Sequence, residues 1–314
     1  MVTVSAPGKI HLMGEHAVVY GYPALLAAIN LRMKVTIAES RDTSGITIHS
    51  PEDISYARYA SDYILETLGI TNPLPSTMTI TSDIPSGYHL GSSAATAVCV
   101  TAAMMYFYKK IWNPIRINEI AYEIEKKQHK NPSGGDNTVV TMGGLIWYRK
   151  ELEFLRSIWQ LPFKPHPQLA HFMIAHTGRP KESTGEMVAI VSEHMKHDPI
   201  HIETQFRINE LQTRRIAAAV KEGNEPELIA SIREGERTLE SIRVVSESVI
   251  ACIRAIEHEG GAAKILGGGG VQGGVGCLLC YHSDPFVLLS ICKRYSYDVT
   301  SIQLGEEGVR LDET

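Results

Sequence analysis

Two carboxylates stand at positions in the sequence where they could do chemistry. The segment 117–127 has apolar residues at helical spacing, and Glu125 lies along the edge of that apolar stripe, away from its charged side. A buried carboxylate is costly unless it is paired or bound to a metal, so Glu125 is either a ligand or a side chain that reaches solvent at the helix end. The turn NPSGGD then places Asp136 directly before an apolar run. There it could act as a general base, or it could simply form the turn.

A glycine- and serine-rich loop precedes a helix of small apolar residues. The stretch IPSGYHLGSSAATAV spans residues 84–98, and the predicted helix continues to about residue 108. The first turn of a helix presents unpaired N–H groups and the positive end of its dipole, which suit a phosphate. Ser92 and Ser93 could cap this helix or bind magnesium. The alternative is an ordinary helix start with a serine cap.

A second glycine-rich segment, KILGGGGVQGGVG, spans residues 264–276. Such backbone can wrap around a phosphate or pack closely beneath one. It is neither a standard P-loop nor, so late in the chain, a dinucleotide-binding fingerprint. The alternative is a loop that only connects a helix to the apolar stretch CLLCY.

The cysteines favour neither a metal site nor disulfides. Cys277 and Cys280 lie in CLLCY, which is typical of a buried strand, and strand residues three apart point to opposite faces. The remaining cysteines, at 99, 252 and 292, are scattered along the chain. An odd number without regular spacing does not indicate a disulfide framework, so we expect a reducing, cytoplasmic location.

Length and composition predict a two-lobed α/β protein that must position these loops. The chain has 314 residues and a formal net charge of −5, so nothing indicates binding to nucleic acid or to an anionic membrane. Alternating patterns predict strands at 2–6, 31–40, 45–50 and 76–83, and a helix at 54–69. Helices are expected within 185–258, with strands around 172 and 277. No export or membrane-spanning segment is visible.

Taken together, three segments resemble the motifs of the GHMP kinases, which phosphorylate small-molecule hydroxyls or acids. They are SAPGKIHLMGEHAVVYGYPAL (5–25), PSGYHLGSSAA (85–95) and KILGGGG (264–270). GEHAVVYG and the pattern at 125–137 are similar to the mevalonate kinases of that family. The resemblance implies an α+β fold with the active site between two lobes. Residues 1–150 would form a lobe like ribosomal protein S5 that binds ATP and Mg²⁺, and residues 151–314 a ferredoxin-like lobe on the substrate side.

The resemblance also implies a reaction and the residues that carry it. The activity would be ATP-dependent transfer of the γ-phosphoryl group to the 5-hydroxyl of mevalonate, in isoprenoid biosynthesis, by a possible homodimer. Asp136 would take or orient the hydroxyl proton beside Lys9, while Glu125 and Ser93 would hold Mg²⁺. The implied binding residues are Glu15, His16, Ser183 and Thr184 for the acceptor, and Gly87, Leu90, Gly91, Ser92, Ser93, Ala94 and Gly268 for the nucleotide.

The sequence departs from the family pattern in places that leave other acceptors open. His89 stands where a glycine is common and could clash with, or contact, the nucleotide. Leu266 replaces a hydroxyl residue, and Val271 and Gln272 interrupt the glycines. The alternatives are a kinase for phosphomevalonate, another mevalonate hydroxyl or a sugar, and a non-catalytic sensor. A phosphorylated acceptor would require extra cations, for which the candidates are Lys130, Arg179 and Lys181.

Overall fold

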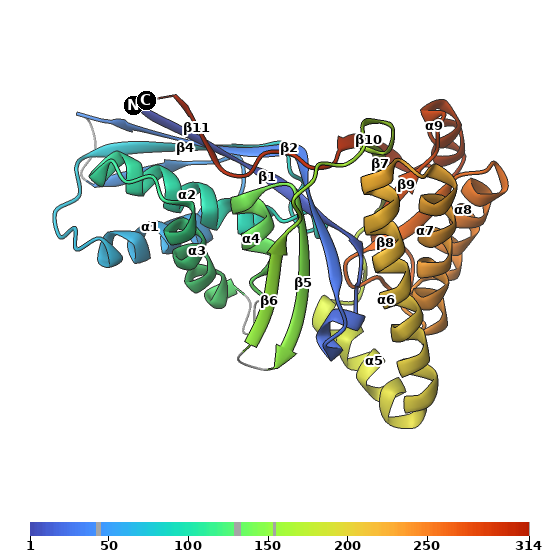
Figure 1. Cartoon of the computed structure of the whole chain (residues 1–314). Coiled ribbons are helices and arrows are strands. Elements are labelled where there is room, and N and C mark those ends of the chain that lie inside the picture. Colours follow the sequence, from blue (N-terminus) through green and yellow to red (C-terminus); the bar gives the residue numbers. More distant parts are fainter. Residues whose placement is uncertain (42–44, 129–132, 153–154, 314) are drawn as a thin grey trace.

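The structure is a computed structural model that describes residues 1–41, 45–128, 133–152 and 155–313. Two lobes, each built on its own β-sheet, lie side by side (Figure 1). Both sheets are mainly antiparallel and carry helices, so the predicted α+β class is confirmed. No described helix is long and apolar enough to cross a membrane.

The first sheet has the strand order β11-β1-β2-β4-β3, with β5 paired to β2 and β6 paired to β5. Its pairs are antiparallel apart from β3 and β4. The strands are β1 (Val2–Met13), β2 (Ala24–Glu39), β3 (Ile46–His49), β4 (Ser76–Ser82), β5 (Leu145–Leu152), β6 (Leu155–Gln160) and β11 (Arg310–Glu313). Because β11 pairs with β1, the two chain ends lie together (Figure 1).

Four helices lie on one face of this sheet (Figure 1). They are α1 (Ser55–Thr67), α2 (Ser92–Lys109), α3 (Pro114–Gln128) and α4 (Gly135–Met142). The central helix, α2, packs against β1, β2 and the other three helices, and every residue from Ala97 to Met105 is buried. Small apolar side chains all around α2 allow this close packing, as its sequence predicted.

The second lobe has the antiparallel strand order β10-β7-β9-β8. Its elements are β7 (His171–Gly178), α5 (Thr184–His197), α6 (Pro199–Glu222), α7 (Glu225–Ser241), α8 (Glu247–His258), β8 (Ala262–Leu266), β9 (Gly276–Tyr281), α9 (Pro285–Arg294) and β10 (Asp298–Gln303). Short 3₁₀ turns occupy Ala17–Tyr20 and Pro167–Leu169. The helices expected within 185–258 and the strands around 172 and 277 are confirmed.

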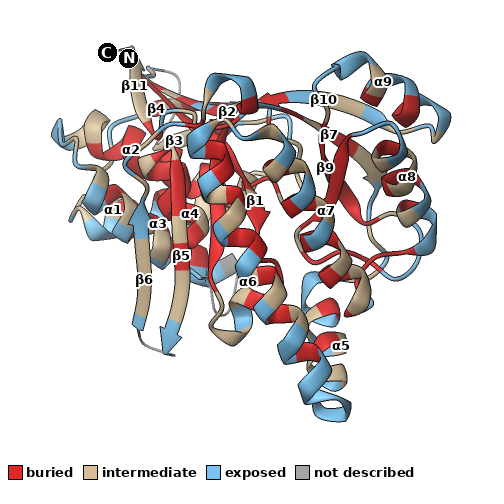
Figure 2. Cartoon of the chain, turned by 45° about the vertical axis from the view of Figure 1, so that its right-hand side comes forward, coloured by how far each residue is buried: buried red, intermediate tan, exposed pale blue. Residues whose placement is uncertain are grey.

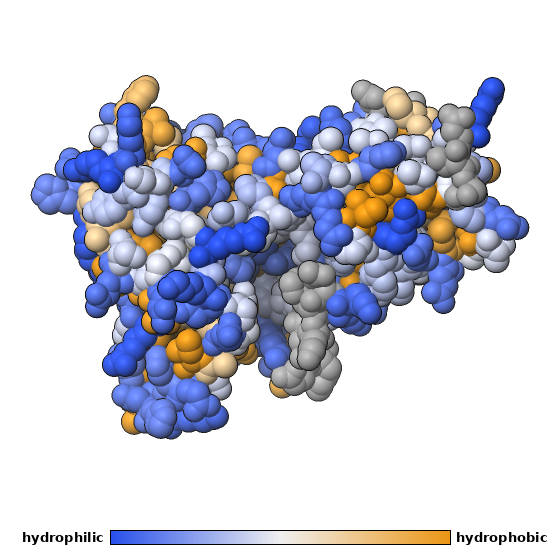
Figure 3. Space-filling view, turned by 180° about the vertical axis from the view of Figure 1, so that it is seen from behind, coloured by the Kyte–Doolittle hydropathy of each residue, from blue (hydrophilic) through white to orange (hydrophobic). Residues whose placement is uncertain are grey.

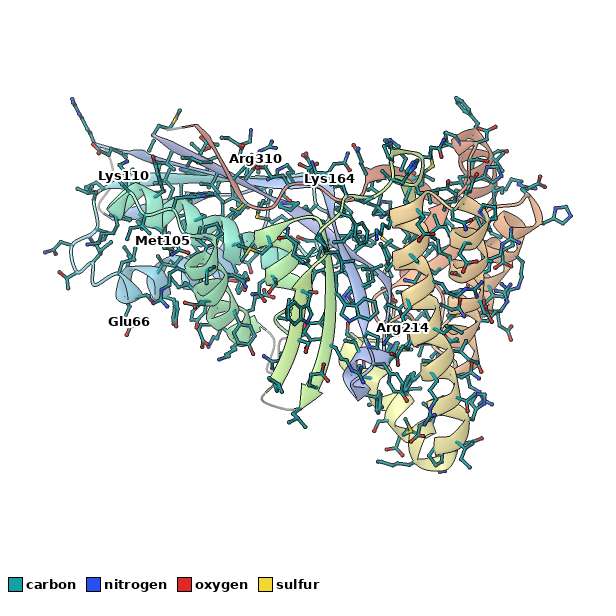
Figure 4. The ribbon with its side chains drawn as sticks, viewed as in Figure 1. Glu66, Met105, Lys110, Lys164, Arg214 and Arg310 are labelled. Carbon is teal, nitrogen blue, oxygen red and sulfur yellow. The ribbon has the colours of Figure 1, made fainter. Side chains whose placement is uncertain are left out.

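The second sheet has a hydrophobic core on each of its two faces, and its buried residues are shown in Figure 2. Cys277 packs in the core that the first lobe shares with α6 and α7, whereas Cys280 packs with α8 and α9. Cys277 and Cys280 thus point to opposite faces, as the alternation in CLLCY predicted, and the described cysteines are buried free thiols. The shared core joins the lobes, and so does the guanidinium of Arg214 on α6, 5.4 Å from the ring centroid of Trp147 on β5 (Figure 4).

The first strand is longer than predicted. We expected it to end at residue 6, but β1 continues through Pro7 and Gly8 to Met13. The register against β2 shifts between Pro7 and Gly8, and such a bulge accommodates a proline within a strand. The extension carries Lys9 and His11 into the middle of the molecule. β2 likewise begins at Ala24, earlier than the expected residue 31.

The proposed lobe boundary at residue 150 remains a prediction. Strand pairing adds that two later segments, β6 and β11, belong to the first sheet. The chain therefore returns to its first lobe after the second is built.

Candidate active site

A cavity of about 320 Å³ lies between the lobes, and Figure 3 shows the molecule hollowed where they meet. Seven of the residues predicted for the site line it: Lys9, Glu15, His16, Glu125, Asp136, Thr184 and Gly268. The first five come from the N-terminal lobe and the last two from the C-terminal lobe. The tertiary structure thus brings together segments that are far apart in the sequence.

Lys9 and Asp136 form an ion pair at the centre of this cavity. The Lys9 Nζ lies 2.9 Å from Asp136 Oδ2, and His11 Nε2 lies 3.6 Å from Oδ1. Asp136 stands in the first turn of α4, where a carboxylate is favoured by the helix dipole, and its side chain is 36% exposed. Burial would raise the pKa of Asp136, but the Lys9 ammonium and the His11 ring hold that pKa well below its ordinary value.

Residues 84–93, the predicted phosphate-binding loop, contact Lys9 through their backbone. The Lys9 N–H donates to the Leu90 carbonyl at 2.9 Å. Gly91 has a φ of 86°, and a Cβ there would lie 2.7 Å from Lys9 Cγ, so only glycine suits this position. Ala94 is fully buried in α2. The structure shows these three residues shaping and packing the loop: Leu90, Gly91 and Ala94.

A second cavity of about 240 Å³ adjoins the start of α2 and is lined by Gly87, Ser92 and Ser93. Ser92 Oγ lies 3.2 Å from Ser86 Oγ, and no side chain caps α2 within the part of the chain that the structure describes. The first turn of α2, with the positive end of the helix dipole, thus adjoins this cavity. Phosphate binding here remains a prediction.

Glu125 lies in the wall of the first cavity, and its hydrogen-bond partner Tyr56 lies in the wall of the second. Its side chain is 2% exposed, and the Tyr56 hydroxyl donates to its Oε1 at 3.0 Å. Burial and the neighbouring carboxylate raise the pKa of Tyr56, so this phenol stays a donor. Tyr56 lines the second cavity and Glu125 the first. The position of Glu125 at the edge of its apolar stripe is explained, since the carboxylate lines the first cavity and accepts from Tyr56.

The oxygen donors that line the two cavities suit Mg²⁺ in kind. Glu125 offers a carboxylate and Ser93 a hydroxyl, both hard ligands. Over the described ranges no group of three or more His, Cys, Asp or Glu could hold a metal ion. Mg²⁺ commonly binds through one or two carboxylates together with substrate phosphates and water, so a small protein contribution is sufficient.

Glu15 and His16 reach the cavity from a tight turn after β1. Lys264 on β8 donates to the Glu15 carboxylate and to the Ile265 carbonyl, and its side chain is fully buried. His16 Nε2 donates to the Gly268 carbonyl at 2.9 Å, and burial lowers the pKa of His16. The predicted pair therefore joins the first lobe to the second glycine-rich loop.

Ser183 and Thr184 occupy different positions at the start of α5. The Ser183 hydroxyl accepts from the Glu186 N–H while Glu186 bonds back to Ser183, which is a capping box. Thr184 lines the cavity and packs near Gly268. Ser183 stays a predicted acceptor residue, although its hydroxyl already caps the helix. Lys130 lies outside the described residues.

The sequence reasoning missed two functional contributors. His11 follows Lys9 by two residues, so both side chains project from the same face of β1, a signal that the strand period could have supplied. Lys264 is a lone charge within the apolar strand AAKIL, and a buried lysine requires a partner. That partner, Glu15, could not be read from the local pattern.

Comparisons with known proteins agree with this geometry. The GHMP kinase N-terminal domain model matches residues 55–144, and a galactokinase galactose-binding signature matches residues 2–39. Mevalonate kinase of Thermococcus sibiricus is 30% identical over 99% of this chain and 98% of its own length. That of Archaeoglobus fulgidus is 32% identical over 85% and 88%.

A solved structure supports the fold. L. major mevalonate kinase, determined in complex with R-mevalonate, matches with a TM-score of 0.83 at 20% identity, over 97% of this chain and 96% of that one. The predicted two-lobed fold is confirmed. From the full-length sequence similarity and the shared architecture, the chain belongs to the GHMP kinase family, together with the mevalonate kinases.

Proposed function

We propose that this protein is an ATP-dependent kinase that transfers the γ-phosphoryl group of ATP to the 5-hydroxyl of mevalonate, giving 5-phosphomevalonate and ADP. The observation that carries the proposal is the Lys9–Asp136 pair, 2.9 Å apart, open to a cavity beside a phosphate-type loop. The similarity to curated mevalonate kinases over the whole chain supports this acceptor.

Asp136 would position the attacking hydroxyl. Because its pKa is held well below the ordinary value, Asp136 stays ionised and is a weak base before the reaction. In phosphoryl transfer through a loose transition state, the nucleophile needs little early deprotonation. Asp136 would therefore accept a hydrogen bond from the hydroxyl and take its proton late. Lys9 would stabilise the charge that develops around the attacking oxygen.

The nucleotide phosphates would lie over the loop from Gly87 to Ser93 and the first turn of α2, with the loop at Gly268 on the opposite side. Glu125 and Ser93 would hold the accompanying Mg²⁺. When bound, this ion neutralises charge on the β- and γ-phosphates.

The charges around the cavity favour an acceptor without a phosphate. Among the described lining residues, Lys9 is the one lysine or arginine, and it is paired with Asp136. Two cations considered for a phosphorylated acceptor lie elsewhere. The Arg179 guanidinium packs beside Gly87, and Lys181 Nζ is 3.5 Å from Gln272 Oε1. Mevalonate is thus a better candidate than phosphomevalonate.

An ADP-release assay with Mg-ATP tests the proposal. Mevalonate, phosphomevalonate and galactose would be compared as acceptors, and phosphorus NMR would locate the new phosphate. We expect turnover on mevalonate with a 5-phosphate product. Turnover on another acceptor alone, or a phosphate on another hydroxyl, would reject the proposed substrate. Nucleotide binding without turnover on any acceptor would indicate a sensor.

A further inference from the structure

His89 adopts a backbone conformation that is uncommon for residues other than glycine. Its φ is 62°, in the left-handed region that favours glycine. Such a conformation is strained for most side chains and persists where the surrounding structure enforces it, often at functional sites. The imidazole ring is therefore expected to have a function that glycine at this position could not supply.

The ring lies between the two glycine-rich loops. His89 lines the same cavity as Lys9 and Asp136. It packs directly on Gly267, where a Cβ would lie only 2.5 Å from His89 Cγ. Gly267 itself has a φ of 79°, so that loop leaves room for this ring. The two positions fit each other: the side chain stands where the backbone favours glycine, and a glycine faces it.

The residue after His89 and the residue after Gly267 are each held by a hydrogen bond. Leu90, the next residue, accepts from the Lys9 N–H at 2.9 Å. On the other loop, the Gly268 carbonyl accepts from His16 Nε2 at 2.9 Å. The imidazole is consequently held at the wall of the cavity that borders the phosphate-type loop and the catalytic lysine.

We propose that His89 is a further catalytic residue, whose imidazole donates a hydrogen bond to a non-bridging oxygen of the γ-phosphoryl group of ATP. This inference rests on the proposed kinase function. The ring extends from the phosphate-type loop, packs on the second glycine-rich loop and lines the cavity of Lys9 and Asp136, so it borders the place where the γ-phosphoryl group would meet the acceptor. Phosphoryl transfer spreads charge over the equatorial oxygens, and a preorganised donor stabilises that charge. His89 forms no covalent bond in the reaction.

Nucleotide titrations without any acceptor test the contact. Calorimetry would measure the dissociation constants of Mg-ADP and of the non-hydrolysable analogue Mg-AMPPNP for the full-length protein. The variants are His89→Gly, His89→Asn, which tolerates positive φ and retains an N–H donor, and Lys110→Gly as control. Lys110 has a similar φ of 54° but lies at the far end of the N-terminal lobe, away from the other lobe (Figure 4).

We expect His89→Gly to lower the preference for Mg-AMPPNP over Mg-ADP about tenfold, since one γ-phosphate hydrogen bond is lost. His89→Asn should recover part of that preference, and Lys110→Gly should leave it unchanged. In turnover, His89→Gly should lower kcat about ten- to a hundredfold with little change in the acceptor KM. Its thermal midpoint should not fall, because glycine relieves the backbone strain.

Two results would overturn the inference. An unchanged Mg-AMPPNP preference in His89→Gly would mean that the ring only fills space over Gly267. Equal weakening of both nucleotides would mean that the ring only shapes the loop. Because the titration contains no acceptor, it is independent of whether mevalonate is the substrate, so failure of one proposal is distinguishable from failure of the other.

Discussion

Two lysine–carboxylate pairs lie around the same active-site cavity and differ mainly in exposure. Lys9 pairs with Asp136, whose side chain is 36% exposed, whereas Lys264 pairs with Glu15 at 0% and 3% exposure. An ion that faces open space can exchange its partner for a substrate group. A pair that is buried between two lobes is shielded from such exchange, and removing one partner leaves the other charge buried and uncompensated. Burial, rather than residue type, thus distinguishes the pair that we propose to be catalytic from the pair between the lobes.

The partners of the sealed pair extend this contrast. The Lys264 ammonium also donates to the carbonyl oxygens of His11 (3.3 Å) and Ile265 (2.6 Å). Alternation along β8 turns Lys264 toward the core shared by the lobes, on the same face as Ala262 and Leu266. The pair is therefore part of the junction that brings the second glycine-rich loop close to the cavity of Lys9 and Asp136.

The largest effect is expected from Asp136→Asn. Turnover should fall at least about 10³-fold, because the hydroxyl loses the group that orients it and accepts its proton. Steady-state assay and nucleotide titration would be run together, and Mg-ATP affinity should change by less than about threefold. Near-normal turnover in this variant would show that the open pair is not the catalytic one.

The sealed pair is broken by Lys264→Met, which leaves Glu15 buried and uncompensated. The free energy of unfolding should fall by about 3–5 kcal/mol, as for other buried ion pairs that lose one partner. Urea unfolding measures this change. The matched control is Lys9→Met, which should abolish most activity with a smaller loss of stability. Equal stability losses in the two variants would remove the distinction that we draw.

Glu236 is a buried carboxylate close to the Lys264–Glu15 pair. Its contribution to the free energy of unfolding should change with pH in the opposite direction to that of Asp136. Burial raises the pKa of Glu236, whose Oε2 accepts from the Ile265 N–H at 3.0 Å. The folded state then keeps a proton that the unfolded chain loses above about pH 4.3, so the contribution of Glu236 to stability falls as pH rises. For Asp136, with a lowered pKa, the contribution is present above about pH 3.9 and is lost as pH falls further.

Glu236→Gln tests that sign, because the amide oxygen can still accept from Ile265. The unfolding free energy of the variant minus that of the unsubstituted protein should increase by about 1 kcal/mol or more as the pH is raised from 5 to 8. Urea unfolding at each pH measures the difference. A constant difference across this range would place Glu236 in the ionised form throughout.

The smallest effects are expected from substitutions of two neighbouring hydroxyl residues at the start of α5, Ser183 and Thr184. Ser183→Ala should lower the unfolding free energy by about 1 kcal/mol, because it removes the helix cap. Thr184→Val keeps the shape of a residue that lines the cavity, and it should raise the acceptor KM while leaving stability nearly unchanged. A large KM effect from Ser183→Ala would support the predicted binding role of that hydroxyl.

Much of the site was predictable from local sequence. The glycines around Ser92, the apolar helix that follows, and Asp136 in its turn each have a physical reason that acts within a few residues. These reasons, together with the resemblance of three motifs, led to the family and to seven of the sixteen residues that line the cavity. The roles of those residues, and a possible homodimer, remain predictions that the experiments above address in part.

The sequence by itself determined the local chemistry: which loops can approach a phosphate, which helix is buried, and where a carboxylate follows a tight turn. Only the tertiary structure decided the partners. Glu15 and Lys264 are 249 residues apart, and His89 meets Gly267 across the two lobes. The physical reason is that desolvation and ion pairing depend on packing between distant segments, which a local pattern does not encode. Packing leaves Asp136 partly exposed in the cavity and buries Glu15 at the cavity wall beside Lys264.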